Sequence, residues 1–286
     1  MKDKLLYIIL FGLSWSVGMQ GLNVPYSYES VSSSQTGIAN LSFNFENASF
    51  LNQESEDITL GVSFSNWIQG TKSSSAFYRD GSSLLRVYSI GDDGLELYGE
   101  VPMDEPLDYF GTHFICLEYS KGIRVPFGIH GGITLRGNYA DLLLDNIYGI
   151  NLDISAIKSI NNRISIGISY KNIKILHEKS EDVRSSLPSN YGFGLSYRIP
   201  LLETDFLYDY RYLDTRNWGS HMSFSKTLGR FSFTLGYSNY KEIYESFSYG
   251  VKILMTKKWS MSYSNINQLH SDFINNHSIG LSFSVK

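Results

Sequence analysis

The segment FSFTLGYS at residues 231–238 alternates a large apolar side chain with a small or polar one. The segment SIGLSFSV at residues 278–285 does the same. Successive side chains of a β-strand point to opposite faces, so each segment predicts a strand with one apolar face and one face of Gly, Ser or Thr. The remainder of the chain can be interpreted outward from these two segments.

The alternation recurs in many separated segments and predicts an all-β fold. Helical periodicity is absent beyond the first eighteen residues. Further alternating segments are LGVSFS from Leu60, YGINLDIS from Tyr148, ISIGISY from Ile164, FGLSYR from Phe193, FLYDYRY from Phe206 and WSMSYS from Trp259.

Composition decides which way the apolar faces point. Aromatic residues make up 15% of the 286 residues and charged residues only 18%, where roughly 25% is usual in soluble domains. A soluble β-sandwich covers its solvent face with Lys and Glu, whereas the non-apolar faces here carry mainly Gly and Ser. The apolar faces are therefore expected to meet lipid, as in an outer-membrane barrel.

Several other classes are excluded by composition. A mean hydropathy of −0.16 excludes a polytopic helical membrane protein. The net charge of −4 offers no basic surface for nucleic acid. The single cysteine, Cys116, allows neither an internal disulfide nor a paired-cysteine metal site. No cofactor is predicted, and no metal site is assigned.

The lengths of the connections also favour a transmembrane barrel. Read back from the C-terminus, long connections (266–276, 239–245, 175–188, 137–145) alternate with short ones such as 255–257 and 227–229. Outer-membrane barrels have short periplasmic turns, longer extracellular loops and an even number of strands. About fourteen antiparallel strands are predicted, at 58–66, 73–80, 83–90, 110–119, 124–136, 146–156, 162–174, 189–198, 203–212, 217–226, 230–238, 246–254, 258–265 and 277–285. Residues 94–100 are placed in a loop.

The N-terminal part divides into two segments. Residues 1–18, MKDKLLYIILFGLSWSVG, have the basic start, apolar run and small residues of a signal peptide. Residues 19–57 lack clear alternation and are expected to form a plug or periplasmic segment. Residues 58–286 form the barrel domain.

Charged residues on the predicted lumen faces suggest a polar network that closes the pore. No nucleophile motif accompanies the lumen histidines, so neither an enzyme nor catalytic residues are predicted. Trp67, Trp218 and Trp259 lie near strand ends, as in the aromatic girdles of membrane barrels. The candidate lumen residues are Glu118, His130, Asp153, Arg198, Asp209, Arg211 and Lys252.

An acidic segment without basic residues is predicted to be an extracellular loop. It is interpreted as a solvated loop or as a site for a divalent cation or a basic partner. Its acidic residues are Asp92, Asp93, Glu96, Glu100, Asp104, Glu105 and Asp108.

Diffuse similarity to a known family runs over most of the chain. GIANLSFNFENASFLN at 37–52, with Asn47-Ala48-Ser49-Phe50-Leu51 before the first strand, resembles the N-terminal region of the PorV/PorQ-like group within the FadL-like barrels. Segments 60–70, 98–123 and 257–285 extend this similarity. The resemblance implies a fourteen-stranded bacterial outer-membrane barrel plugged by its N-terminal segment.

Two roles follow from the resemblance. The first is an accessory to type IX protein secretion or surface anchoring, with secretion components or exported cargo as partners. The second is a FadL-like transporter with a hydrophobic ligand. A soluble exported β-domain that binds a partner is the third hypothesis. Outer-membrane lipid is a partner in the first two.

Overall fold

The computed structural model describes residues 22, 24–53, 57–67, 70–98, 105–141, 146–178, 188–214, 217–240, 244–269 and 276–285, without the side chains of 177, 178 and 244. The expected signal peptide, 1–18, lies outside these residues. No helix in the described part of the chain is long and apolar enough to cross a membrane.

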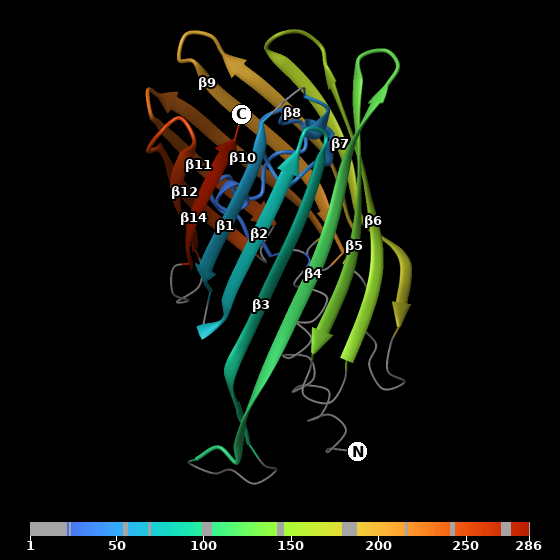
Figure 1. The fold of residues 1–286 in the computed structure, drawn as a ribbon, viewed down its shortest axis with the longest axis vertical. Helices are drawn as coiled ribbons and strands as arrows, with labels where there is room; N and C mark the ends of the chain where they lie inside the picture. The colour runs from blue at the N-terminus through green and yellow to red at the C-terminus, as the bar shows by residue number, and fades with distance from the viewer. Residues whose placement is uncertain are drawn as a thin grey trace.

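Fourteen strands form one closed antiparallel barrel, which confirms the predicted fold class (Figure 1). Each strand pairs with its neighbours in sequence, and β14 closes on β1 through the register Ile58↔Val285 to Asn66↔His277. The strands are β1 (Ile58–Asn66), β2 (Lys72–Asp80), β3 (Ser83–Leu97), β4 (Asp108–Val125), β5 (Ile129–Asp141), β6 (Asn146–Ser159), β7 (Ile164–Glu178), β8 (Asn190–Ile199), β9 (Thr204–Leu213), β10 (Asn217–Leu228), β11 (Phe231–Tyr240), β12 (Tyr244–Leu254), β13 (Trp259–Gln268) and β14 (Asn276–Val285).

The two ends of the barrel differ in their connections. One end, here called the turn end, carries the tight connections 81–82, 126–128, 160–163, 200–203, 229–230 and 255–258, together with the start of β1 and the end of β14. The opposite, loop end carries the connections 67–71, 98–107, 142–145, 179–189, 214–216, 241–243 and 269–275, of which three are seven residues or longer. Two connections predicted as long, 137–145 and 239–245, are shorter in the structure, at 142–145 and 241–243. The reason is that β5, β11 and β12 extend beyond their predicted ends.

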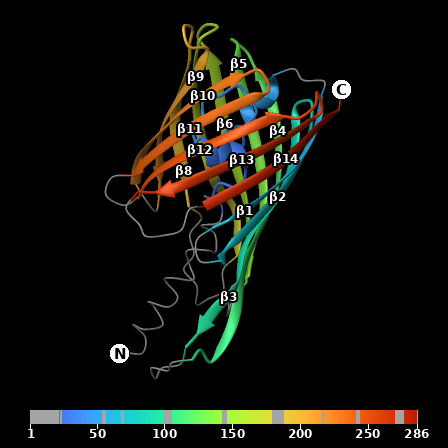
Figure 2. The ribbon, with the colours of Figure 1, turned by 90° about the vertical axis from the view of Figure 1, so that its left-hand side faces the viewer.

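The β3–β4 hairpin corrects the placement of residues 94–100 in a loop. Residues up to Leu97 belong to β3, and β4 begins at Asp108. The register of the pair shifts between Asp92 and Leu95, so a bulge interrupts the alternation that the sequence pattern relies on. The hairpin extends well past the other strands (Figures 1 and 2).

The outer surface of the barrel is a belt of large apolar side chains. In β11, Phe231, Phe233 and Leu235 are between 43% and 50% exposed, while Thr234 and Ser238 at the alternate positions are buried. Exposure of alternating apolar residues on every side is the pattern of a lipid-facing wall. Further members of the belt are Leu60, Val62, Phe64, Leu117, Ile154, Ile168, Phe193, Phe224, Phe247, Met261, Ile279 and Leu281.

Two of the three tryptophans near strand ends face outward. Trp218 stacks on Tyr210 at 4.7 Å between ring centroids, and Trp259 packs on Phe283 at 4.6 Å. Trp67 does not belong to this girdle, so the prediction from its position near a strand end is wrong for this residue. Its indole packs against a buried lumen cluster and donates to Ser73 Oγ at 2.9 Å.

Residues 24–53, here called the plug, lie inside the barrel (Figure 1). The short helix α2 (Tyr28–Ser32) is capped by Ser27, whose side chain accepts from Ser30 N. The 3₁₀ helix η2 (Ala48–Asn52) is capped in the same way by Asn47. Most plug side chains are buried, including Val31, Ile38, Phe50 and Leu51. The plug therefore supplies the core that the lipid-facing strands cannot form.

Candidate functional site

Glycines on the inner faces of the strands let the plug backbone approach the wall. A Cβ on Gly122 would lie 2.7 Å from Asn52 N, and one on Gly194 would lie 2.7 Å from Ala39 N. Real side chains essentially never tolerate such contacts, so the glycine-rich inner wall is complementary to the plug. The inner faces at Gly132, Gly167 and Gly236 meet the plug backbone in the same way.

Hydrogen bonds attach the plug to strands around the barrel. Asn52 Nδ2 donates to Ile123 O on β4 at 2.8 Å and to Gly131 O on β5 at 2.5 Å. On the opposite side, His221 of β10 contacts Ser34 O at 2.7 Å and Tyr240 Oη at 2.9 Å. Additional wall contacts join Ser49 to Ser155, Ser34 to Ser248 and Ser63 to Tyr26 O.

The first of two buried ion clusters holds the plug through Glu46. Glu46 Oε2 accepts from Lys171 Nζ at 2.8 Å and from Arg211 Nη1 at 2.9 Å. Arg211 Nη2 also donates to Asp209 Oδ2 at 2.6 Å, and Asp209 in turn accepts from the backbone of Gly37 at 2.8 Å. Five groups from the plug, β7 and β9 are thus joined in one network.

The environment of Glu46 favours its charged form. Burial alone would raise the pKa of this carboxyl, but the positive charges of Lys171 and Arg211 outweigh burial and hold the pKa well below its usual value. Glu46 therefore remains an anion between two cations, which is the condition for the cluster to bind the plug.

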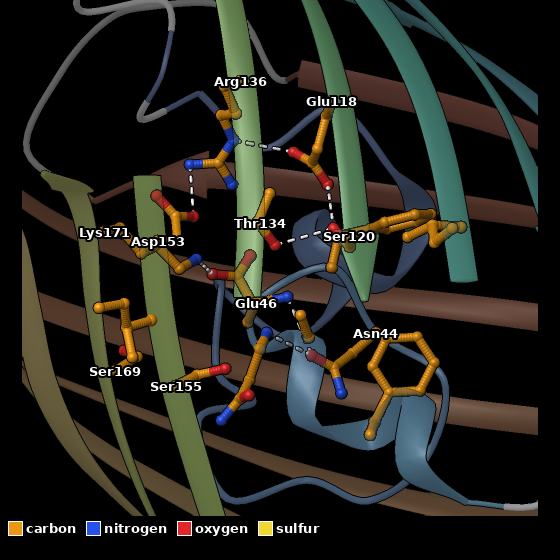
Figure 3. A pocket seen from close by; sticks show the side chains of 16 residues that line it. Asn44, Glu46, Glu118, Ser120, Thr134, Arg136, Asp153, Ser155, Ser169 and Lys171 are labelled. Atoms are coloured by element: carbon orange, nitrogen blue, oxygen red, sulfur yellow. Dashed lines mark hydrogen bonds and ion pairs between the residues drawn. The ribbon is translucent and has the colours of Figure 1, made fainter. Parts of the chain in front are cut away.

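The second ion cluster lies on the wall itself, across β3 to β6. Glu118 Oε2 accepts from Arg86 at 2.7 Å and from Arg136 at 2.8 Å. Arg136 Nη1 also contacts Asp153 Oδ2 at 2.5 Å. Figure 3 shows Glu118, Arg136 and Asp153 converging with Glu46 and Lys171 on one small cavity of about 10 Å³. A neighbouring cavity of about 30 Å³ also has room for water only.

The structure distributes the seven candidate lumen residues over three environments. Glu118, Asp153, Asp209 and Arg211 are buried in the two ion clusters. Lys252 is partly buried, with Nζ 3.8 Å from Glu29 of the plug. Arg198 pairs with Asp205 at 3.4 Å at the exposed turn end. His130 lies near the turn end of β5 and is half-buried.

Four members of the clusters were not among the candidates. Arg86 lies between the outward residues Leu85 and Val87, and Arg136 between Leu135 and Gly137, so strict attention to register would have found both. Lys171 precedes Asn172, whose positive φ of 61° accompanies a register shift, and alternation fails there. Glu46 belongs to the plug, which has no periodic pattern to indicate its orientation.

An apolar cluster fills the lumen toward the loop end. It contains Tyr88, Ile90 and Phe114 from the wall and Tyr26 from the plug, whose ring lies 3.9 Å from that of Tyr88. Leu22, Val24 and Trp67 pack against it, and Cys116, Ala140 and Ile147 complete it. The free thiol of Cys116 is a buried packing group here.

A groove of about 570 Å³ lies on the outer face of the same wall. Its floor consists of the small residues Ser74, Ser89 and Gly91, and the two serine hydroxyls lie 2.9 Å apart. Phe64 and Ile115 flank it on β1 and β4. The lipid-facing belt is therefore interrupted at β2 and β3, at the height of the inner apolar cluster.

Ile90 belongs to both features, since it is buried in the apolar cluster and also lines the groove. The wall at this height is near the end of the β2–β3 ladder, where Lys72↔Gly91 is the last pair and Ser73↔Ile90 the one before it. Terminal ladder pairs open at lower free energy than central ones. At this height the terminal pairs of the β2–β3 ladder separate the outer groove from the inner apolar cluster.

The acidic residues divide between strand and connection. Asp92 is buried and accepts from Thr71 Oγ1 at 3.1 Å, while Asp93 is exposed and lies 3.0 Å from His113 Nε2. Glu96 is in β3, Asp108 begins β4 and Glu105 precedes it. Glu100 and Asp104 lie outside the described residues. Within the described residues, no group of three or more His, Cys, Asp or Glu is arranged to hold a metal ion.

Solved structures with this architecture include named transporters. The toluene transporter TbuX of Ralstonia pickettii gives a TM-score of 0.60 at 12% identity, over 91% of this chain and 98% of that one. The monoaromatic hydrocarbon channel CymD gives 0.60 at 13%, over 94% and 97%. A FadL homologue of Pseudomonas aeruginosa gives 0.54 at 10%, over 91% and 97%. This chain shares their fold.

The likeness extends over nearly the whole length of these barrels, but at such identities it establishes the fold alone. None of the three is named as an enzyme or as a component of a secretion system. No family model matches the chain, and no curated protein matches it. The FadL-like part of the sequence resemblance is thus supported at the level of fold, whereas its PorV/PorQ-like part has no such support.

Proposed function

We propose that this chain is a bacterial outer-membrane barrel that gives hydrophobic small molecules a path through its wall. The observation that carries the proposal is the back-to-back arrangement of an apolar lumen cluster and an outer groove that share Ile90. Similarity of fold to a toluene transporter and a monoaromatic hydrocarbon channel supports it. We therefore prefer transport to the role in type IX secretion.

The filled lumen argues against passage of polar solutes. The buried ion clusters leave cavities of about 10 and 30 Å³ at the centre of the barrel. A hydrated solute needs a continuous water path, and displacing the plug would break the buried ion pairs of Glu46 with Lys171 and Arg211. An apolar molecule needs no water path, because it has no bound water to give up. It can take the place of the Tyr26 and Trp67 side chains beside Ile90.

The path we propose leaves the lumen sideways. It requires the last β2–β3 pairs, Ser73↔Ile90 and Lys72↔Gly91, to separate, together with the Trp67–Ser73 and Thr71–Asp92 bonds. Small side chains at Ser74, Ser89 and Gly91 leave room on the lipid side. The molecule then enters the membrane directly and never crosses the ion clusters.

Uptake of radiolabelled toluene by Gram-negative cells that express the full chain tests the proposal. The double variant Ser74→Phe/Ser89→Phe fills the groove, and Ser220→Phe on the outward face of β10 is the matched control. We expect uptake by wild type and control to exceed that of cells without the protein, and uptake by the double variant to fall to that background. Equal uptake by the wild type, the control and the double variant, each shown to be folded in the membrane, would contradict the proposed path.

A further inference from the structure

The β3–β4 hairpin continues beyond the barrel as a free two-stranded ribbon. The last pair of β3 with β2 is Gly91↔Lys72, and the first pair of β4 with β5 is His113↔Asp141. Residues 92–97 and 108–112 therefore pair only with each other within the described part of the chain. Figure 2 shows this ribbon projecting past the loop end.

Both outer edges of the ribbon carry backbone groups without a neighbouring strand. Unpaired N–H and C=O groups along an edge are a template for a further strand. An isolated two-stranded hairpin is marginally stable in water. A third strand would satisfy one edge and stabilise the ribbon.

One face of the ribbon is also apolar and exposed. Tyr109 is 60% exposed, directly opposite Glu96, and Leu107 beside it is 58% exposed. Tyr98, 46% exposed, donates its hydroxyl to Glu96 Oε2 at 2.7 Å. This part of the hairpin lies beyond the barrel wall, so the apolar groups lack the lipid that covers those of the belt.

The negative charge of the ribbon indicates which kind of strand could bind to it. No Lys or Arg occurs between Arg86 and Lys121, while Asp93, Glu96, Glu105 and Asp108 are all on or beside the two strands. Like charges on two such edges disfavour pairing between copies of this chain, which is how natural proteins protect edge strands. Basic side chains on an added strand would instead be attracted.

We propose that the ribbon binds an extended basic segment of a partner polypeptide by β-strand addition. Backbone bonds to the free edge supply affinity, Lys or Arg side chains face the acidic residues, and alternate apolar side chains pack on Tyr109 and Leu107. A lone divalent cation is a poorer match, because the described carboxylates do not converge as a ligand set. This interaction is independent of transport through the wall.

Binding of fluorescent peptides to the full chain in nanodiscs tests the proposal, with empty nanodiscs as reference. The probes are a ten-residue peptide of alternating Lys and Val, its Glu–Val counterpart, and a Lys–Val peptide with Pro at two central positions. Only the first is expected to bind, with new hydrogen-exchange protection at 92–97 or 108–112. Equal binding of the proline peptide would overturn strand addition, and equal binding of the Glu peptide would overturn the charge argument.

Variants locate the site. Glu96→Gln/Glu105→Gln/Asp108→Asn is expected to weaken binding about tenfold, which is about 0.5 kcal/mol for each of three exposed charge pairs. Asp80→Asn/Glu203→Gln/Asp205→Asn removes the same formal charge at the turn end and should leave binding unchanged. Equal loss in both triple variants would show a non-specific effect of net charge and would overturn the assignment to the ribbon.

Discussion

Glu46→Gln is the change that most sharply probes how the plug is held. The substitution removes the charge from a carboxylate that is 6% exposed and accepts from Lys171, Arg211 and Ser30 at 2.8 to 2.9 Å. Arg211 keeps Asp209 at 2.6 Å, but Lys171 is left beside a neutral amide. The side chain keeps its size, so packing is little affected.

The expected cost follows from these contacts. Removing one partner of a buried ion pair costs about 3 to 5 kcal/mol, and the lower end applies because Arg211 retains a carboxylate. A loss of about 3 kcal/mol corresponds to about a hundredfold shift toward the undocked plug. The barrel strands, whose ladders do not involve Glu46, should be affected much less.

Native-state hydrogen exchange in nanodiscs measures this shift. The amides of Gly37 and Ile38 donate to Asp209 and report docking directly. Their protection should fall about a hundredfold in Glu46→Gln. Glu29→Gln, on the same plug but 3.8 Å from its partner Lys252, is the control and should change protection by less than tenfold. Unchanged protection of Gly37 and Ile38 in Glu46→Gln would refute the reasoning.

Three further predictions concern the plug and the lipid face. Because the pKa of Glu46 lies below its ordinary 4.5, plug docking should be fully stabilised above pH 4.5 and weaken as the pH falls below it, as measured by exchange at Gly37. Gly132→Ala would place a Cβ 2.5 Å from the Ala48 carbonyl carbon and should cost about 1 to 3 kcal/mol of unfolding free energy. Gly137→Ala on the same strand meets no atom within 4 Å and should cost nothing measurable. Equal losses of unfolding free energy in the two variants would contradict the close-approach argument. Leu235→Arg at the middle of β11 should cost about 2 to 4 kcal/mol in vesicles, and a neutral effect would mean that this face does not meet lipid.

The strands could be predicted because alternation is a property of each segment by itself. In β11 and β14, one residue in two faces lipid along the whole strand, so composition alone orients them. The pattern fails where the backbone departs from a regular pleat. The bulge at Asp92 hides the end of β3, and the positive φ of Asn172 reverses the parity of β7.

Less of the candidate site than of the fold could be predicted from the sequence. Register placed Glu118, Asp153 and Asp209 on inner faces, but the partners of an ion cluster come from several strands and depend on the closure of the barrel. Glu46 and Trp67 lie outside the strands, and only the folded plug shows where their side chains point. The groove forms where small residues of β2 and β3 lie at the same height in the barrel, and the sequence of either strand alone does not show this.

Residues 24–53 are proposed to close the lumen to water, while the wall serves hydrophobic molecules. Conductance of the purified full chain in a planar bilayer tests this claim directly. The ion clusters and the water-sized cavities around Glu46 and Arg136 predict no stable open state. A large and stable conductance would mean an open aqueous pore and would contradict it.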